Sequence, residues 1–298
     1  MSIYLEKMED VTGLKPVVEK LAGISAFEAY RFCDDFADIH KRYDVFKIVY
    51  SGGEAILKLY DEAPEAFEQE KKTYQMFPEE APVPKVLGFS DGFMLSEFIP
   101  GDDLKEVTDE TAAAAGRSVA EIMNAFPLDG EYNRTEAEKL IARRKDRAEF
   151  LQNEPLLREA YAVYLDRLKD MPLTMENGDF LPINCIYNGE RVYIIDWEFG
   201  GFLPYALDIA RFMAHAGEGE GYTYRMADRQ KQIFMDTIYE NLLVKPDRRI
   251  FDRDIQIALM DEMVIILKRY LTDLSVPREA EFDLYYRRAC DIAKKLLS

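Results

Sequence analysis

The sequence has few of the residues that build disulfide frameworks and transition-metal sites. It contains only three cysteines, Cys33, Cys185 and Cys290, and only two histidines in 298 residues. Three widely spaced cysteines predict no disulfide framework. Two histidines with scattered cysteines also predict no zinc-type metal cluster. Any metal chemistry in this chain is therefore expected to use oxygen ligands.

Basic residues are scarce relative to acidic ones. Lysine and arginine number 38 against 56 aspartates and glutamates, which gives a formal net charge of −18. Nucleic acids and anionic membranes are held mainly by basic patches, so we expect neither as a partner. The acidic excess suits a cationic small substrate, and it is equally compatible with a role in solubility.

The chain also lacks a long apolar run. Its longest uncharged stretch, residues 180–189, is far shorter than the roughly 18 residues that a membrane span needs. Residues 1–10 contain Glu6, Glu9 and Asp10 and no apolar core, so no signal peptide is expected. These absences predict a cytoplasmic protein.

What is present predicts two lobes. Strand patterns dominate residues 29–60, where Ser51-Gly52-Gly53 supplies the turn of a hairpin, and Pro64 then begins a helix. Beyond Pro100 the apolar residues follow helical spacing. We expect an α+β protein with a nucleotide-binding lobe and a second lobe that carries the catalytic loop, the metal site and the substrate site. The first is a small antiparallel sheet with one helix, residues 1–98, and the second is mainly helical, residues 99–298.

Three oxygen-bearing side chains are brought together within residues 177–198. Asp179 precedes Asn184 by five residues, and the Asn188-Gly189 turn predicts a hairpin whose returning strand carries Asp196 back towards that loop. Carboxylate and amide oxygens are ligands that Mg²⁺ accepts, with substrate phosphates filling the other positions. Turn capping explains any one of these residues, but their joint spacing favours a metal site.

A second pair of charged residues lies in the first lobe. Lys58 shares a strand face with Ile56 and Tyr60, and Glu70 lies on the apolar face of the following helix. An unpaired buried charge costs several kcal/mol, so we expect the two residues to form an ion pair that faces the cleft between the lobes. The alternative is that each side chain reaches solvent separately.

These motifs resemble those of the aminoglycoside phosphotransferase and choline kinase family, which shares the two-lobed architecture of protein kinases. Residues 177–184 (NGDFLPIN) resemble its His-Gly-Asp-x-x-x-x-Asn catalytic loop, and residues 194–198 (IIDWE) resemble its metal-binding segment. Residues 205–210 (YALDIA) are similar to the helix that follows. In the first lobe, residues 55–58 (AILK) resemble the strand of the nucleotide-binding lysine, and residues 93–101 (FMLSEFIPG) resemble the hinge.

The resemblance implies Mg²⁺-dependent transfer of the γ-phosphoryl group of ATP or GTP to a hydroxyl group. Asp179 would accept or orient the hydroxyl proton, while Asn184 and Asp196 would hold Mg²⁺. Lys58, fixed by Glu70, would neutralise the nucleotide phosphates. The backbone that binds the purine base would be that of the hinge residues Glu97, Phe98 and Ile99.

Two features depart from the family pattern. Asn177 stands where the family has histidine, and because asparagine can make similar bracing hydrogen bonds, we expect activity to survive. The segment expected to cover the phosphates, residues 34–43, contains no glycine, although close backbone approach to phosphate favours glycine. Three side chains are candidates to contact phosphate instead, or else form a solvated loop tip: His40, Lys41 and Arg42. Asp208 is expected to brace the catalytic loop.

For the acceptor we expect a small cationic alcohol. An aminoglycoside, which would imply antibiotic resistance, is the first choice, and choline, ethanolamine or another metabolite alcohol is the second. Acidic residues are the candidates for binding a polyamine: Glu198, Glu218, Glu220, Asp261 and Glu262. Aromatic residues are the candidates for a cation–π cage around a quaternary ammonium group: Trp197, Tyr222 and Tyr224. A nucleotide-binding pseudokinase is the alternative from another class. The protein is expected to be a monomer or a homodimer.

Overall fold

The computed structural model describes residues 3–36, 39–60, 63–219, 221–272 and 280–298. The chain folds into two compact units. The N-terminal unit comprises Met1–Pro100 and Trp197–Phe199, and the C-terminal unit comprises Gly101–Asp196 and Gly200–Ser298. The short segment Trp197–Phe199 therefore belongs to the N-terminal unit, although the residues before it, up to Asp196, belong to the C-terminal unit.

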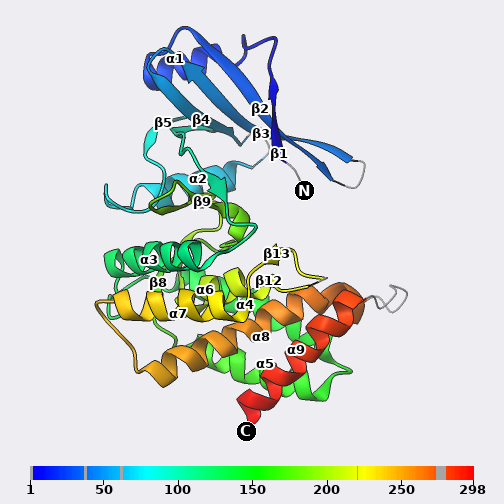
Figure 1. Cartoon of the computed structure of the whole chain (residues 1–298). Helices are drawn as coiled ribbons and strands as arrows, with labels where there is room; N and C mark the ends of the chain where they lie inside the picture. Colours follow the sequence, from blue (N-terminus) through cyan, green and yellow to red (C-terminus); the bar gives the residue numbers. More distant parts are fainter. Residues whose placement is uncertain (1–2, 37–38, 61–62, 220, 273–279) are drawn as a thin grey trace. The chain divides into compact units, whose positions relative to one another are not determined.

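The N-terminal unit is built on a six-stranded antiparallel sheet with the order β1-β2-β3-β4-β6-β5 (Figure 1). The expected hairpin is present, with Tyr50 opposite Gly53 across its turn. Strand β1 extends the sheet beyond the strands predicted, and the unit holds two helices where one was expected for the lobe. The elements are β1 (Ile3–Lys7), α1 (Lys15–Ala22), β2 (Phe27–Phe36), β3 (Ile39–Tyr50), β4 (Gly53–Leu59), α2 (Pro64–Tyr74), β5 (Val86–Ser90) and β6 (Phe93–Glu97).

The core of the N-terminal unit forms where α1 packs against the sheet. Val18 of α1 is fully buried together with Ile48, Leu57 and Leu95 from three strands. Alternate residues of a strand face opposite sides of a sheet, so burial of Leu57 directs its neighbour Lys58 to the other face. The sheet pattern thus positions the lysine beside α2.

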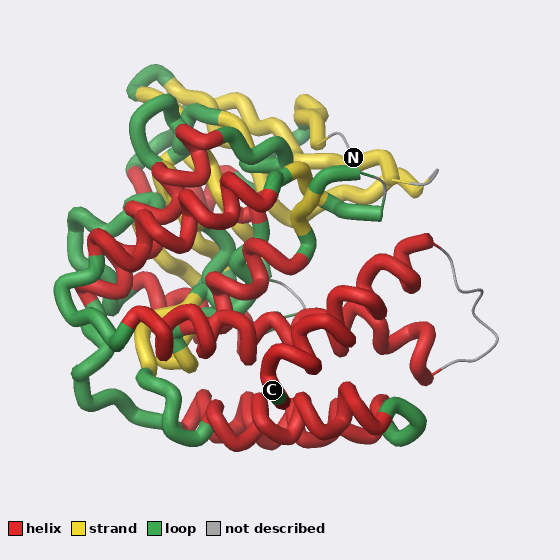
Figure 2. Tube along the Cα trace, turned by 60° about the horizontal axis from the view of Figure 1, so that its bottom comes forward, coloured by secondary structure: helices red, strands yellow, loops and turns green. Residues whose placement is uncertain are grey.

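The C-terminal unit is mainly helical, and Figure 2 shows its long helices packed along one another. Helix α8 packs against α6 and α9, while α3 packs against α7 (Figure 1). The helices are α3 (Asp109–Ala125), α4 (Thr135–Arg147), α5 (Pro155–Leu168), α6 (Ala206–Ala214), α7 (Asp228–Asn241), α8 (Arg248–Thr272) and α9 (Ala280–Leu297). Two short 3₁₀ helices lie at Ala148–Leu151 and Pro182–Asn184. Among the described residues, no helix is long and apolar enough to cross a bilayer.

Short strands place the central loops of the C-terminal unit. The predicted hairpin is formed by β9 and β10, and β7 pairs with its outer side. Strands β8 and β11 bring the two ends of the segment 177–200 together, a pairing that the sequence did not predict. The strands are β7 (Asp102–Asp103), β8 (Leu173–Glu176), β9 (Cys185–Tyr187), β10 (Val192–Ile194), β11 (Gly201–Pro204), β12 (Ala216–Gly217) and β13 (Tyr224–Arg225).

Helix α3 packs tightly against α7 at Gly116. A Cβ atom there would lie 2.8 Å from the carbonyl oxygen of Phe234 and 2.9 Å from Cβ of Thr237. In a helix interior alanine is normally favoured over glycine by about 1 kcal/mol. We predict the reverse here: Gly116→Ala lowers the free energy of unfolding by roughly 1–3 kcal/mol, because the added methyl group overpacks the contact.

Urea denaturation of the full chain measures this effect. Ala113→Gly, at a half-buried position of the same helix, is the control and is expected to lose only about 1 kcal/mol of helix propensity. A Gly116→Ala protein more stable than the wild type would contradict the close approach of α3 and α7.

Candidate active site

The loop after β8 is held by a buried carboxylate. Asp208, in the first turn of α6, accepts hydrogen bonds from the backbone N–H groups of Asn177 and Gly178, the latter at 3.0 Å. Its own backbone N–H donates to the buried carboxyl group of Glu176 at 2.7 Å. Burial raises the pKa of Asp208 to about 7, although the two backbone N–H groups act in the opposite direction. Gly178 has φ = 78°, a conformation that glycine adopts without strain.

Asn177 joins both sides of this loop. Its side-chain amide donates to the carbonyl oxygens of Ile195 at 3.1 Å and Asp196 at 2.9 Å, and its side-chain oxygen accepts from the backbone N–H of Asp179 at 3.1 Å. The side chain is buried, so these groups have no easy replacement by water. Asparagine thus makes the bracing contacts that were expected of it at this position.

Arg211 binds one of the two carboxylate oxygens of Asp179. The guanidinium group of Arg211 donates through Nε to Oδ1 of Asp179 at 2.9 Å and also through Nη2. The other oxygen, Oδ2, has the Asn184 amide at 3.4 Å. Arg211 follows Asp208 by three residues on α6, so one face of that helix carries both the loop brace and the Asp179 clamp. Sequence reasoning missed Arg211, whose signal was this i,i+3 spacing.

Asn184 and Asp196 offer oxygen atoms at the two ends of the motif. The Asn184 amide nitrogen donates to the backbone carbonyl of Asp179 at 2.8 Å, which leaves its side-chain oxygen as the free end of the group. The backbone N–H of Ile195 donates to the Asn184 carbonyl at 3.0 Å and ties the segment before Asp196 to the loop. Asp196 has φ = 63°, which is uncommon for a residue with a side chain and is typical of positions under functional constraint. Amide and carboxylate oxygens are a donor set that fits Mg²⁺.

A chain of charges continues from Arg211 into the helical core. Arg211 donates through Nη1 to Glu262 of α8 at 3.1 Å, and Nε2 of His215 lies 3.4 Å from the same glutamate oxygen. Burial acts to raise the pKa of Glu262, but the hydrogen bond with His215 and the Arg211 charge hold it below its usual range. Glu262 is therefore an ionised partner of Arg211.

The acidic surface expected for a polyamine is not assembled as predicted. Asp261 is 1% exposed and is bound by Arg144 at 2.9 Å and Arg147 at 2.7 Å. Glu262 is also buried and is taken by Arg211 and His215, as described above. Both residues lie on a helix whose inward face the sequence pattern did not separate from its outward face. Glu218 is exposed, and Glu220 lies outside the described residues.

In the N-terminal unit, Lys58 and Glu70 form the expected ion pair. Nζ of Lys58 on β4 lies 2.8 Å from Oε2 of Glu70 on α2, and the two side chains are 17% and 1% exposed. The hydroxyl group of Tyr60 donates to the same oxygen, while the backbone N–H of Trp197 donates to Oε1 at 3.0 Å. The buried carboxylate is therefore satisfied on both oxygens, and the lysine is fixed in one position.

Glu198 and Trp197 were predicted to bind the acceptor, but their surroundings in the structure do not match that role. Glu198 is 3.5 Å from Lys58 Nζ and so belongs to the surroundings of the lysine. Trp197 is buried with its ring 4.6 Å from that of Phe77, so no open ring face is available for a cation–π cage. Tyr224 is buried as well, and burial together with the Asp179 charge raises its pKa to about 12.

In the hinge and in the glycine-free segment, several groups predicted to bind the nucleotide have partners within the protein. The backbone N–H of Glu97 donates to the carbonyl oxygen of Lys85 at 2.9 Å, so this hinge donor is already used. Nζ of Lys47 lies 4.0 Å from the centroid of the Phe98 ring. Arg42 pairs with Glu6 of β1 at 3.0 Å, which accounts for its charge without a phosphate. Lys41 lies over the Tyr43 ring, and the His40 side chain lies outside the described residues.

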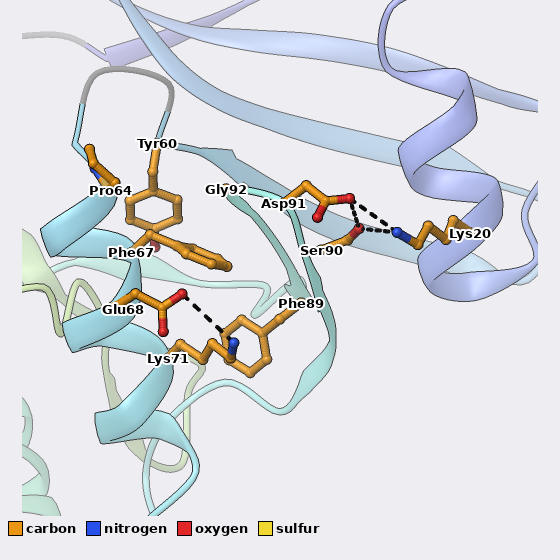
Figure 3. Close-up of a pocket in the computed structure, with 10 residues that line it drawn as sticks. All are labelled: Lys20, Tyr60, Pro64, Phe67, Glu68, Lys71, Phe89, Ser90, Asp91 and Gly92. Atoms are coloured by element: carbon orange, nitrogen blue, oxygen red, sulfur yellow. Dashed lines mark hydrogen bonds and ion pairs between the residues drawn. The ribbon is translucent and has the colours of Figure 1, made fainter.

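A pocket of about 590 Å³ opens beside α2 (Figure 3). Its aromatic wall consists of Tyr60, Phe67 and Phe89, with Lys20 and Lys71 at its edges. Tyr60 connects this pocket to the ion pair through its bond to Glu70. The Lys58 and Glu70 side chains are not among its lining residues, so the pocket is distinct from that pair.

The fold and these motifs define a small-molecule phosphotransferase with a kinase-like architecture. Residues 35–237, more than half of the chain, match a family described as the phosphotransferase enzyme family (APH). The protein belongs to this family, whose kinases use ATP. No curated protein matches the sequence significantly.

Solved structures confirm the predicted α+β fold. Choline kinase LicA from Streptococcus pneumoniae is 14% identical with a TM-score of 0.59, covering 95% of this chain and 98% of that one. A choline kinase from Cryptosporidium parvum Iowa II is 12% identical with a TM-score of 0.56, with coverages of 97% and 95%. The spectinomycin phosphotransferase APH(9)-Ia, in complex with ADP and spectinomycin, is 15% identical with a TM-score of 0.55, with coverages of 96% and 98%. At such low identity the likeness concerns the fold alone.

The bracing role of Asn177 can be tested with a nearly isosteric change. Asn177→Asp replaces the amide donor by a carboxylate oxygen that faces the carbonyl groups of Ile195 and Asp196. We predict that the free energy of unfolding falls by at least about 1–3 kcal/mol, because buried acceptors lose their donor. Chemical denaturation at pH 7 measures the change.

Asn188→Asp is the matched control. The side-chain oxygen of Asn188 accepts from the backbone N–H groups of Glu190 and Arg191, and an aspartate can do the same. We expect this variant to keep wild-type stability. Equal stability of the two variants would show that the Asn177 amide makes no bracing contribution.

Proposed function

We propose that this protein is a Mg²⁺-dependent kinase that transfers the γ-phosphoryl group of ATP to a hydroxyl group of a small molecule. The observation that carries the proposal is the geometry at Asp179. Arg211 holds Oδ1, so the carboxylate is fixed in position, while Oδ2 has the Asn184 amide at 3.4 Å as its neighbour among the described residues. A fixed carboxylate with one available oxygen is suited to accept the proton of a substrate hydroxyl.

The remaining roles follow from the charges that phosphoryl transfer must neutralise. Lys58, held by Glu70, would bind the nucleotide phosphates, and the hinge at Phe98 and Ile99, with the Glu97 carbonyl, would bind the base. The side-chain oxygens of Asn184 and Asp196 would hold Mg²⁺, which supplies charge neutralisation at the phosphates when bound. The acceptor oxygen forms its bond to the γ-phosphorus as its proton passes to Asp179 Oδ2. The bond from that phosphorus to the β,γ-bridging oxygen breaks, and ADP leaves.

The structure offers little support for the cationic acceptor that we first expected. Two of the five acidic candidates, Asp261 and Glu262, are consumed by ion pairs inside the C-terminal unit. A third, Glu198, lies beside Lys58. The acceptor therefore has to be identified from the positive groups of the C-terminal unit as much as from the negative ones.

The function is tested by transfer of labelled γ-phosphate from ATP and GTP to a panel of small alcohols, with Asp179→Asn protein alongside. We expect product from the wild type and at least a hundredfold lower kcat, about the contribution of a general base, in the variant. Binding of ATP should persist in Asp179→Asn. Near-normal turnover of the variant would remove Asp179 from this role, and a wild type that binds ATP without any product would favour the pseudokinase.

The role of Lys58 can be followed with the single tryptophan of the chain, Trp197, whose backbone N–H binds Glu70. Lys58→Met is expected to weaken ATP binding by about tenfold or more, since charge-assisted contacts to phosphate are lost. Titration of Trp197 fluorescence with ATP measures the dissociation constant. Lys85→Met, which removes an exposed lysine of the same unit, should bind ATP as the wild type does. Unchanged affinity in Lys58→Met would place the phosphates elsewhere.

A further inference from the structure

The aromatic ring of Tyr222, in the loop between α6 and α7, lies close to cationic side chains from two helices. Nζ of Lys231 on α7 lies 5.8 Å from the centroid of its ring, and the guanidinium carbon of Arg288 on α9 lies 5.4 Å from it. Gly217 leaves room for the ring, because a Cβ atom there would lie 2.3 Å from it. We call these three residues, Tyr222, Lys231 and Arg288, the Tyr222 cluster.

The positive charge of the Tyr222 cluster is poorly compensated. The Lys231 side chain is only 16% exposed, and its partner Asp228, at 3.3 Å, is 99% exposed. Burial lowers the pKa of Lys231 and the Arg288 charge lowers it further, whereas Asp228 and Glu218 act to raise it. Within the part of the chain that the structure describes, Arg288 donates to the carbonyl oxygen of Ala214 at 2.9 Å and makes no ion pair.

A second tyrosine in the same unit, Tyr239, also has two cationic side chains over its ring. Lys245 and Arg248 lie 5.6 Å and 5.0 Å from the centroid of the Tyr239 ring. There the arginine also binds Asp236 at 2.6 Å and Asp252 at 2.8 Å. At Tyr239 it is therefore the arginine that has carboxylate partners. At Tyr222 the lysine has one, the exposed Asp228, whereas Arg288 makes no ion pair among the described residues, which leaves the Arg288 charge for an anion supplied from outside.

The Tyr222 cluster is continuous with the residues around the catalytic carboxylate. Arg288 binds the carbonyl of Ala214, and the next residue, His215, meets Glu262, which also binds Arg211. Arg211 holds Asp179 and lies one helical turn before His215. The C-terminal turn of α6 thus links the Tyr222 cluster to the Asp179 clamp through Ala214, His215 and Glu262.

We propose that the phosphoryl acceptor is a hydroxylated anion, whose carboxylate or phosphate group is bound by Lys231 and Arg288 while its hydroxyl group reaches Asp179. This inference rests on the proposed function and replaces the cationic acceptor expected from the sequence. The transfer step is the one given above. The anionic group takes no part in it and serves to orient the acceptor.

The acceptor class is tested with compounds that share one carbon skeleton and differ in charge. D-gluconate and glucose 6-phosphate are the anions, glucose is the neutral compound and glucosamine is the cation, with kanamycin and choline as further cations. We expect kcat/KM to be at least about tenfold higher for an anion than for its neutral or cationic counterpart. Preferred transfer to glucosamine, kanamycin or choline would overturn the proposal.

Variants locate the effect. Lys231→Met, which keeps the length and apolar stem of the side chain, should lower kcat/KM for the anionic acceptor about tenfold, with KM for ATP unchanged. Lys245→Met is the matched control at the Tyr239 site, and it should leave both constants as in the wild type. An unchanged kcat/KM for the anionic acceptor in Lys231→Met would overturn the assignment of the Tyr222 cluster.

A binding measurement decides the question without turnover. Reductive methylation with ¹³C-formaldehyde keeps the lysine charge and gives each lysine an NMR signal, which Lys231→Met and Lys245→Met assign. Titration with inorganic phosphate and with D-gluconate should shift the Lys231 signal saturably and leave that of Lys245 in place. The Asp179→Asn protein should show the same shift without transfer, so failure of catalysis and failure of the anion site are distinguishable. An unmoved Lys231 signal would overturn the proposal.

Discussion

The candidate active site depends on one buried carboxylate. Asp208 binds the backbone N–H groups of Asn177 and Gly178 while its own N–H is held by Glu176, so the catalytic loop is fixed at its first two residues. A buried carboxyl group needs hydrogen bonds to offset its lost hydration, and the loop needs partners for buried N–H groups. Each requirement satisfies the other. The position of Asp179 then follows from that of Gly178, the residue before it.

Helix α6 transmits this constraint to the rest of the C-terminal unit. Residues spaced three to four apart lie on one helix face, so Asp208, Arg211 and His215 follow one another along α6. The first braces the loop, the second holds Asp179, and the third meets Glu262 of α8. A short helix with an ordinary apolar composition therefore aligns three polar contacts. Burial acts to lower the pKa of Arg211, but the charges of Glu262 and Asp179 raise it above its usual value, so the clamp stays charged.

Contacts between residues that are close in the sequence could be predicted from it, whereas strand pairs and ion pairs between residues far apart in the sequence could not. The β3–β4 and β9–β10 hairpins follow from their turn residues, and the Lys58–Glu70 pair follows from two charges on apolar faces. The β8–β11 pairing joins four-residue strands that carry no alternating pattern of their own, so only the folded loop shows it. Asp261 looked like an exposed acid because its partners, Arg144 and Arg147, are more than a hundred residues away in the chain. Helix α8 is buried around much of its circumference, which removes the polar stripe that would have distinguished an inward carboxylate.

The overall charge of the protein gives the Tyr222 cluster its significance. Acidic residues outnumber basic ones by 56 to 38, so carboxylate partners for a cationic side chain are abundant in this sequence. Arg248, at Tyr239, binds two of them. Two neighbouring half-buried cations repel each other, and the repulsion is strongest where water is displaced. A sequence with such an excess of acidic residues could have relieved it with one more carboxylate. An anionic ligand bound by Arg288 would supply that compensation. Because the chain as a whole is acidic, a site of positive charge would favour such a ligand locally, which couples selectivity for the acceptor to its orientation at Asp179.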